Sequence, residues 1–126
     1  MNEPSNTRPV AWTIAGSDSG GGAGVQADLR AFDALGVHGC SAVAALTAQN
    51  STKVEVIEPV SAVMLDAQLA ALAADMPPAA IKTGMLGSVE NLEVVVRWID
   101  RLREGNPSMA VVVDPRSMPC CPRRLT

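Results

Sequence analysis

The amino-acid sequence predicts an α/β fold in which helices flank a parallel sheet. Short apolar runs alternate with segments whose apolar residues recur at helical spacing, which is the pattern of βαβ units. Five glycines lie between residues 16 and 24, directly after the first apolar run. Small or polar residues also follow the later runs. Four such loops should therefore meet at one edge of the sheet, where open α/β folds bind ligands.

The first part of the chain holds two strands and a helix. Residues 10–15 form the first strand, and apolar residues with helical spacing place a helix at residues 23–35. Gly36 supplies the stop at the end of this helix. A second strand at residues 40–46 leads into a polar loop at residues 47–51.

The rest of the chain continues this alternation. A short strand is predicted at residues 54–57, and Ser61 caps a helix that two prolines terminate. A strand at residues 80–83 precedes a helix that Ser88 caps. The last strand, residues 109–113, is uniformly apolar and suits a sheet covered on both faces. The last helix should bury one apolar face, made of Leu92, Val95, Val96, Ile99 and Leu102.

Composition excludes several classes of function. The net charge is −3, and the aromatic residues are two tryptophans and one phenylalanine, so the chain has neither a basic stripe nor platforms for stacking bases. We therefore expect no nucleic-acid partner. No apolar run has the roughly eighteen residues of a membrane span. The polar segment 1–9, expected to be a disordered tail, lacks the apolar core of a signal peptide. We expect a cytoplasmic protein without a membrane partner.

The cysteines and the histidine form no recognisable site. Cys40 is expected to be a small buried residue with a reduced thiol, and His38 has no Ser or Cys partner at a catalytic spacing. Cys120 and Cys121 are adjacent and lack a second pair of metal-binding residues. We therefore expect no metal site among them.

The glycine-rich loop was tested against two known phosphate loops. A P-loop requires a Gly-Lys pair, which the sequence does not contain. Residues 22–27 match the dinucleotide fingerprint, but that fold also needs an acidic residue about twenty positions later. After Asp33 the next acid is Glu55, so a nicotinamide enzyme is the weakest alternative. A loop between a strand and a helix is expected to present free backbone N–H groups to a ligand.

Four segments occur in a recognisable order and spacing. They are AGSDSGGGAGVQAD at residues 15–28, ALTAQN at 45–50, IKTGML at 81–86 and VVVDP at 111–115. Together they resemble the hydroxymethylpyrimidine and phosphomethylpyrimidine kinases of thiamine biosynthesis, which belong to the ribokinase superfamily. The resemblance covers roughly residues 10–115 and implies a ribokinase-like sheet.

The resemblance implies an enzyme that transfers the γ-phosphoryl group of ATP, with Mg²⁺, to 4-amino-5-hydroxymethyl-2-methylpyrimidine and then to its monophosphate. The implied partner is this small pyrimidine, and the full-length family offers a homodimer as its assembly. Carried over to this chain, Gly16 and Ala23 line the pyrimidine pocket, Gln49 hydrogen-bonds the amino edge of the ring, and Met85 packs against its face. Asp114 lies near the phosphate and magnesium end.

Two further residues each have two interpretations. Asp18 is a substrate-binding candidate within the glycine-rich loop, but an aspartate at such a position also forms Asx-turns. Lys82 ends a strand near the site, where it either reaches a phosphate or ends in solvent or an ion pair.

The chain departs from the family pattern in its second half. Family members are about twice as long, and they carry an Asn-x-x-Glu segment, adenine-binding loops and a Gly-Thr-Gly-Cys anion hole that this sequence does not contain. We therefore expect the sheet to be truncated after about four strands, with no catalytic residue in this chain and no activity by the chain alone. Residues 116–126 should be an aberrant, disordered tail, produced by a shift of reading frame near Pro115.

Two other functions stay open. A pyridoxal kinase phosphorylates a hydroxymethyl group on a similar ring, although the polar loop at residues 47–50 favours the pyrimidine. A non-catalytic module would instead bind the pyrimidine or its phosphate without releasing ADP.

Overall fold

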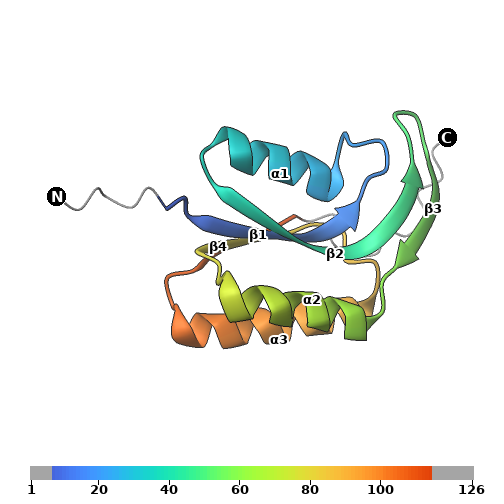
Figure 1. Ribbon diagram of the computed structural model, residues 1–126. Helices are drawn as coiled ribbons and strands as arrows, with labels where there is room; N and C mark the ends of the chain where they lie inside the picture. The colour runs from blue at the N-terminus through green and yellow to red at the C-terminus, as the bar shows by residue number, and fades with distance from the viewer. Residues whose placement is uncertain (1–6, 115–126) are drawn as a thin grey trace.

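The computed structural model describes residues 7–114, which form a five-stranded sheet with helices on both faces (Figure 1). The predicted α/β class is therefore confirmed. The expected tail at residues 116–126, with Cys120 and Cys121, lies outside the described residues. The strands are β1 (Val10–Ser17), β2 (His38–Gln49), β3 (Val54–Pro59), β4 (Ala80–Thr83) and β5 (Ala110–Val113), and the helices are α1 (Gly24–Ala34), α2 (Ala62–Asp75) and α3 (Val89–Gly105).

The strands lie in the order β3-β2-β1-β4-β5. β2, β1, β4 and β5 are parallel to one another, whereas β3 runs antiparallel to β2 at one edge. The prediction of a parallel sheet of about four strands is right for these four. It is wrong for β3, whose direction is set by a hairpin rather than by a helical crossover.

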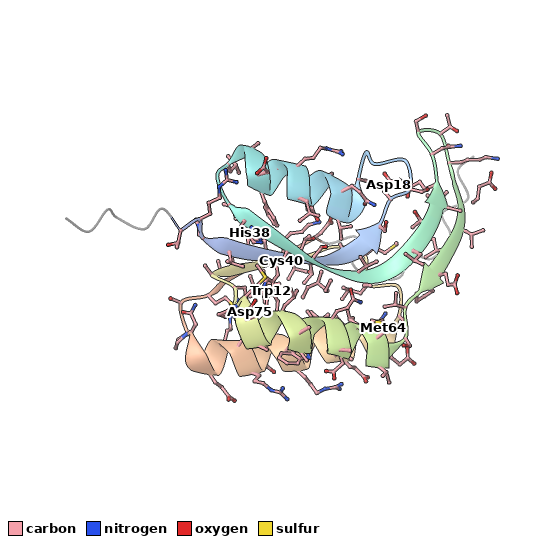
Figure 2. The ribbon with its side chains drawn as sticks, viewed as in Figure 1. Trp12, Asp18, His38, Cys40, Met64 and Asp75 are labelled. Carbon is pink, nitrogen blue, oxygen red and sulfur yellow. The ribbon has the colours of Figure 1, made fainter. Side chains whose placement is uncertain are left out.

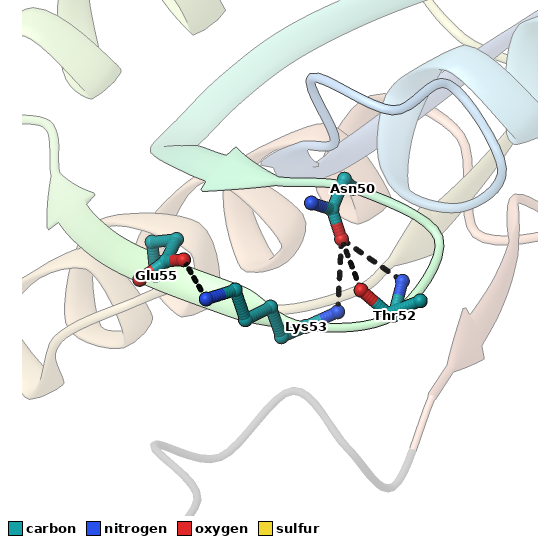
Figure 3. Close-up of polar contacts among 4 residues, drawn as sticks. All are labelled: Asn50, Thr52, Lys53 and Glu55. Atoms are coloured by element: carbon teal, nitrogen blue, oxygen red, sulfur yellow. Dashed lines mark hydrogen bonds and ion pairs between the residues drawn. The ribbon is translucent and has the colours of Figure 1, made fainter.

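A tight turn joins β2 to β3. The side-chain oxygen of Asn50 accepts hydrogen bonds from Thr52 N at 2.9 Å, Thr52 Oγ1 at 2.8 Å and Lys53 N at 3.0 Å (Figure 3). This short turn lets β2 continue to Gln49 while it pairs with β3. The predicted polar loop at residues 47–51 was therefore wrong for its first three residues, which belong to the strand. Polar residues on an edge hairpin resemble a loop in sequence because solvent reaches both structures.

The two faces of the sheet carry different layers. α1 covers one face, and α2 and α3 cover the other (Figure 1). Successive β1 side chains point to opposite layers: the Trp12 indole N–H donates to Met76 O at 2.8 Å, whereas Thr13 bonds to Asp28 of α1. Figure 2 places Trp12 and Cys40 between the sheet and α2. The core on this side includes Trp12, Ile14, Leu65, Leu69, Ile81, Val95 and Trp98.

The predicted helix ends are confirmed. Ser61 Oγ accepts a hydrogen bond from Met64 N at 3.1 Å, and Ser88 Oγ accepts one from Asn91 N at 3.1 Å. Gly36 follows α1 with a φ of +74°, a left-handed conformation that glycine adopts without strain. No helix within residues 7–114 has the length and hydropathy to cross a membrane.

The predicted buried face of α3 is confirmed except at Val96. Val95 is buried, and Leu92, Ile99 and Leu102 are partly buried against the core, but Val96 is 48% exposed. The buried positions also include Asn91, Val94 and Trp98. The large Trp98 ring occupies the interface with α2, where its indole N–H donates to a carboxylate at 2.8 Å. Burying this ring moves Val96 toward solvent.

β5 is an edge strand of the described sheet. Val112 and Val113 are 60% and 61% exposed. The prediction that this strand is covered on both faces is therefore wrong for residues 7–114, where β4 is its one neighbouring strand. Its apolar sequence is that of an interior strand.

Candidate functional site

A cavity of about 360 Å³ opens at the carboxyl edge of the parallel strands. Its walls come from the glycine-rich loop after β1, the end of β2, the start of β3, and the residues at and after the ends of β4 and β5. The structure brings together around this cavity all six residues that the sequence proposed as ligand-binding, and their individual roles stay predictions. These residues are Gly16, Asp18, Ala23, Gln49, Met85 and Asp114.

Asp18 organises the glycine-rich loop. Its carboxylate accepts hydrogen bonds from Gly20 N at 2.8 Å, Gly22 N at 3.0 Å and Ala23 N at 2.8 Å, and the residue is only 6% exposed (Figure 2). A carboxylate before a helix is favourable because it satisfies free N–H groups and faces the positive end of the helix dipole. The expectation that the loop presents free N–H groups is therefore wrong for these three amides.

Close backbone contacts explain two of the glycines in this region. Gly24 has a φ of +62°, and a Cβ there would lie 2.4 Å from Gly16 O, so no other residue fits without moving the loop. Gly16 in turn faces the side chain of Met85, which comes from the loop after β4. The bare backbone at residue 16 thus lets the Met85 side chain form part of the cavity wall.

Gln49 stands at the end of β2 and is fixed to the glycine-rich loop through its backbone. Gln49 N donates to Ser19 Oγ at 2.7 Å, and Ser19 Oγ donates to Gln49 O at 2.5 Å. The Thr47 hydroxyl donates to Ser17 O at 2.8 Å, and Gln49 Oε1 lies 3.3 Å from the same hydroxyl. A hydroxyl has a single proton, so the Gln49 amide is held in place more loosely than its backbone. The role of Ser19 was not predicted, since no sequence pattern pairs a loop serine with the backbone of a later strand.

Lys82 forms an ion pair beneath the loop. Its Nζ lies 2.8 Å from Asp28 Oδ2 on α1, and Thr13 Oγ1 donates to the same oxygen at 2.6 Å. Of the two interpretations of Lys82, the ion pair is therefore present, and Lys82 also lines the cavity. Sequence analysis missed Asp28 and Thr13. The sequence pattern that could have indicated Asp28 is its helical spacing: it lies three residues after the apolar Val25 and next to Leu29, on the face of the helix that packs against the sheet.

The histidine and the buried cysteine lie away from the cavity. His38 begins β2, whereas the cavity lies at the opposite end of that strand, at Gln49. Cys40 is a buried free thiol, as predicted, with its sulfur 3.8 Å from Met76 Sδ on the α2 side. Burial raises the pKa of the Cys40 thiol by desolvating the thiolate.

Asp114 is the acidic residue at the β5 side of the cavity. Its backbone N–H donates to Thr83 O at 3.1 Å, which holds the end of β5 against β4. Within the described part of the chain, no group of three or more His, Cys, Asp or Glu side chains is arranged to hold a metal ion.

The profile of the phosphomethylpyrimidine kinase family matches residues 18–119. The chain belongs to this family. A hydroxymethylpyrimidine/phosphomethylpyrimidine kinase of Synechococcus elongatus is 53% identical over 91 residues, which cover 72% of this chain and 35% of the relative. The Bacillus subtilis enzyme of the same name is 48% identical over 105 residues, covering 83% of this chain and 37% of the relative.

Solved structures of phosphomethylpyrimidine kinases and pyridoxal kinases share this fold. The phosphomethylpyrimidine kinase of Clostridium difficile superposes with a TM-score of 0.75 at 34% identity, over 87% of this chain and 52% of that one. A Staphylococcus aureus pyridoxal kinase, solved with AMP-PCP and pyridoxal, gives a TM-score of 0.71 at 34% identity, over 86% and 39%. The predicted family and ribokinase-like fold are confirmed. The chain spans little more than a third of the length of the two curated relatives.

Proposed function

We propose that this chain forms the pyrimidine-binding part of a kinase that phosphorylates 4-amino-5-hydroxymethyl-2-methylpyrimidine and its monophosphate. The observation that carries the proposal is the convergence of all four family segments on one cavity, with Gln49 and Met85 in its wall. Membership of the phosphomethylpyrimidine kinase family supports the choice of ligand.

The cavity residues suit an aminopyrimidine. A primary amide has both a donor and an acceptor, so Gln49 pairs with the amino group and the adjacent ring nitrogen in a way that a carboxylate or a hydroxyl does not. The Met85 thioether is polarisable and packs well on an aromatic face. Gly16 and Ala23 line the cavity with small residues that leave room for the ring. Asp18 stabilises the glycine-rich loop through hydrogen bonds to its amides rather than by contact with the ligand.

The phosphoryl donor in this proposal is ATP. A pyridoxal kinase with the same fold has been solved with the ATP analogue AMP-PCP. Phosphoryl transfer depends mainly on positioned charges and metal ions around the phosphates. Asp114 is the residue of this chain that we place nearest to the Mg²⁺ that would accompany ATP. The sequence contains no Gly-Thr-Gly-Cys anion hole, so we expect this 126-residue chain to bind the pyrimidine without turning over ATP.

Pyridoxal is the second candidate ligand. Pyridoxal kinases of Staphylococcus aureus and Bacillus subtilis share the fold, with TM-scores of 0.71 and 0.76. Pyridoxal has a ring hydroxyl and an aldehyde in place of the amino edge that Gln49 would pair with. We therefore place it second.

The proposal also includes the oligomeric state and the cellular location of the protein. Leu46, Val56 and Ile57 are about half exposed on β2 and β3, and such an apolar edge favours the homodimer expected of the family. A dimer should sediment at about twice the monomer mass. The proposed location is the cytoplasm, where ATP is available.

The deciding experiment is a calorimetric titration of the purified chain with the pyrimidine, with pyridoxal as the matched ligand, followed by an assay for ADP release. We expect saturable binding of the pyrimidine, weaker binding of pyridoxal, and no ADP above a protein-free control. Tighter binding of pyridoxal would overturn the choice of ligand, and ADP release coupled to a phosphorylated pyrimidine would overturn the expected inactivity.

A further inference from the structure

The charged residues in the cavity wall are unequally available to a ligand. They are Asp18, Lys82 and Asp114. Both carboxylate oxygens of Asp18 already accept hydrogen bonds from the glycine-rich loop. Among the described residues that line the cavity, Lys82 is therefore the cation that an anionic ligand would meet.

The Lys82 side chain is held in a defined position. Thr13 and Lys82 are paired across β1 and β4, and both bond to the same oxygen of Asp28. The side chains of Lys82 and Asp28 are 26% and 19% exposed, so the pair is partly buried while its ammonium still reaches the cavity. A Cβ at Gly84 would lie 3.2 Å from Nζ. The missing side chain at residue 84 thus leaves room beside the ammonium.

The Lys82 ammonium can donate more hydrogen bonds than the one that it makes to Asp28. Lys82 Nζ has three N–H donors, and the bond to Asp28 uses one of them. Asp18 already accepts hydrogen bonds from three amides of the loop before α1, those of Gly20, Gly22 and Ala23. Among the described residues that line the cavity, Lys82 is the one whose cationic side chain can donate a charge-assisted hydrogen bond to a phosphate.

We propose that Lys82 is a specificity-determining residue that binds the phosphate group of a phosphorylated pyrimidine, while Asp28 and Thr13 keep the ammonium in place. This inference rests on the proposed function, in which the same cavity accepts a neutral alcohol and its monophosphate. Lys82 would contribute to binding the monophosphate and little to binding the alcohol.

The test uses the 126-residue chain and titrates it calorimetrically with the alcohol and with the monophosphate. Lys82→Met should weaken monophosphate binding about tenfold or more, since a charge-assisted hydrogen bond is lost, and should change alcohol binding less than about twofold. Lys82→Arg should keep most of the affinity for the monophosphate. Lys53→Met is the matched control because Lys53 pairs with Glu55 on the exposed hairpin (Figure 3).

A double variant and a pH series give two further tests of the role of Lys82. Asp28→Asn combined with Lys82→Met leaves no unpaired charge and should show the same selective loss. Because the second pKa of a phosphate ester is near 6, wild-type affinity for the monophosphate should fall between pH 7.5 and 5, and this fall should shrink in Lys82→Met but not in Lys82→Arg. Equal losses for both ligands, or no loss, would overturn the inference alone. Failure of the wild-type chain to bind either ligand would overturn the proposed function with it.

Discussion

The terminal methyl of Met85 lies where a side chain at Gly16 would begin: a Cβ at residue 16 would be 2.7 Å from Met85 Cε. These residues come from loops after β1 and β4, which are neighbouring parallel strands. The contact therefore sets one wall of the cavity from two segments that are distant in the sequence.

This contact predicts that Gly16→Ala harms binding more than folding. The Met85 side chain is flexible, so it can move aside and leave the position that we assign to the pyrimidine ring. We expect weaker pyrimidine binding, measured by calorimetry, and a change in unfolding free energy below about 1 kcal/mol.

Gly24→Ala is the matched comparison. Its Cβ would meet the backbone oxygen of Gly16 at 2.4 Å, and its φ is +62°. Backbone cannot yield as a side-chain end does, so we expect a loss of roughly 1–3 kcal/mol in urea unfolding. A larger loss of stability for Gly16→Ala than for Gly24→Ala would contradict this assignment.

Asp18→Asn tests whether Asp18 supports the loop. An amide keeps one acceptor oxygen in place of two, so at least one of the bonds from Gly20, Gly22 and Ala23 is lost. The free energy of unfolding should fall by about 1–2 kcal/mol. Asp33→Asn is the control, since Asp33 lies in an exposed pair with Arg8 and should change stability by less than about 0.5 kcal/mol. Similar small effects from both variants would remove Asp18 from the structural role.

The exposed edge of β5 predicts self-association. Its apolar sequence carries no charge or proline to block pairing with another strand, and we expect the chain to bind the dye ANS and to aggregate. Val112→Lys should lower both light scattering and ANS fluorescence. Val96→Lys, at an exposed site on α3, should change them much less. Equal effects would show that added charge, rather than the strand edge, governs solubility.

The sequence could predict features that depend on neighbouring residues. Ser61, Ser88 and Gly36 marked helix ends because capping is a local interaction. The direction of β3 was missed although the turn that Asn50 closes is also local, because residues 47–51 were predicted to form a polar loop rather than a hairpin. The exposure of Val96 was missed because the packing of one large side chain, Trp98, decided the face of α3.

In the candidate site, too, some features could be predicted from the sequence and others depend on the tertiary fold. The resemblance proposed six residues for this site, and their convergence on one cavity followed from the parallel strand order, whereas their roles in binding stay predictions. The hydrogen bonds from the loop amides to Asp18 were not predicted, because they depend on how the Asp18 side chain folds back into the loop. The partnership of Lys82 with Asp28 was missed for a related reason: it joins residues on β4 and α1 that only the tertiary fold brings together.

Calorimetric titration of the wild-type chain and Gln49→Leu with 4-amino-5-hydroxymethyl-2-methylpyrimidine measures whether Gln49 recognises an aminopyrimidine in this cavity. Leaving the amino edge of a buried ring unpaired costs about 1–3 kcal/mol. We expect a loss of binding of that size in Gln49→Leu, with thermal unfolding unchanged because the backbone bonds to Ser19 are kept. Equal affinity of the wild-type and variant chains for the pyrimidine would contradict this role of Gln49.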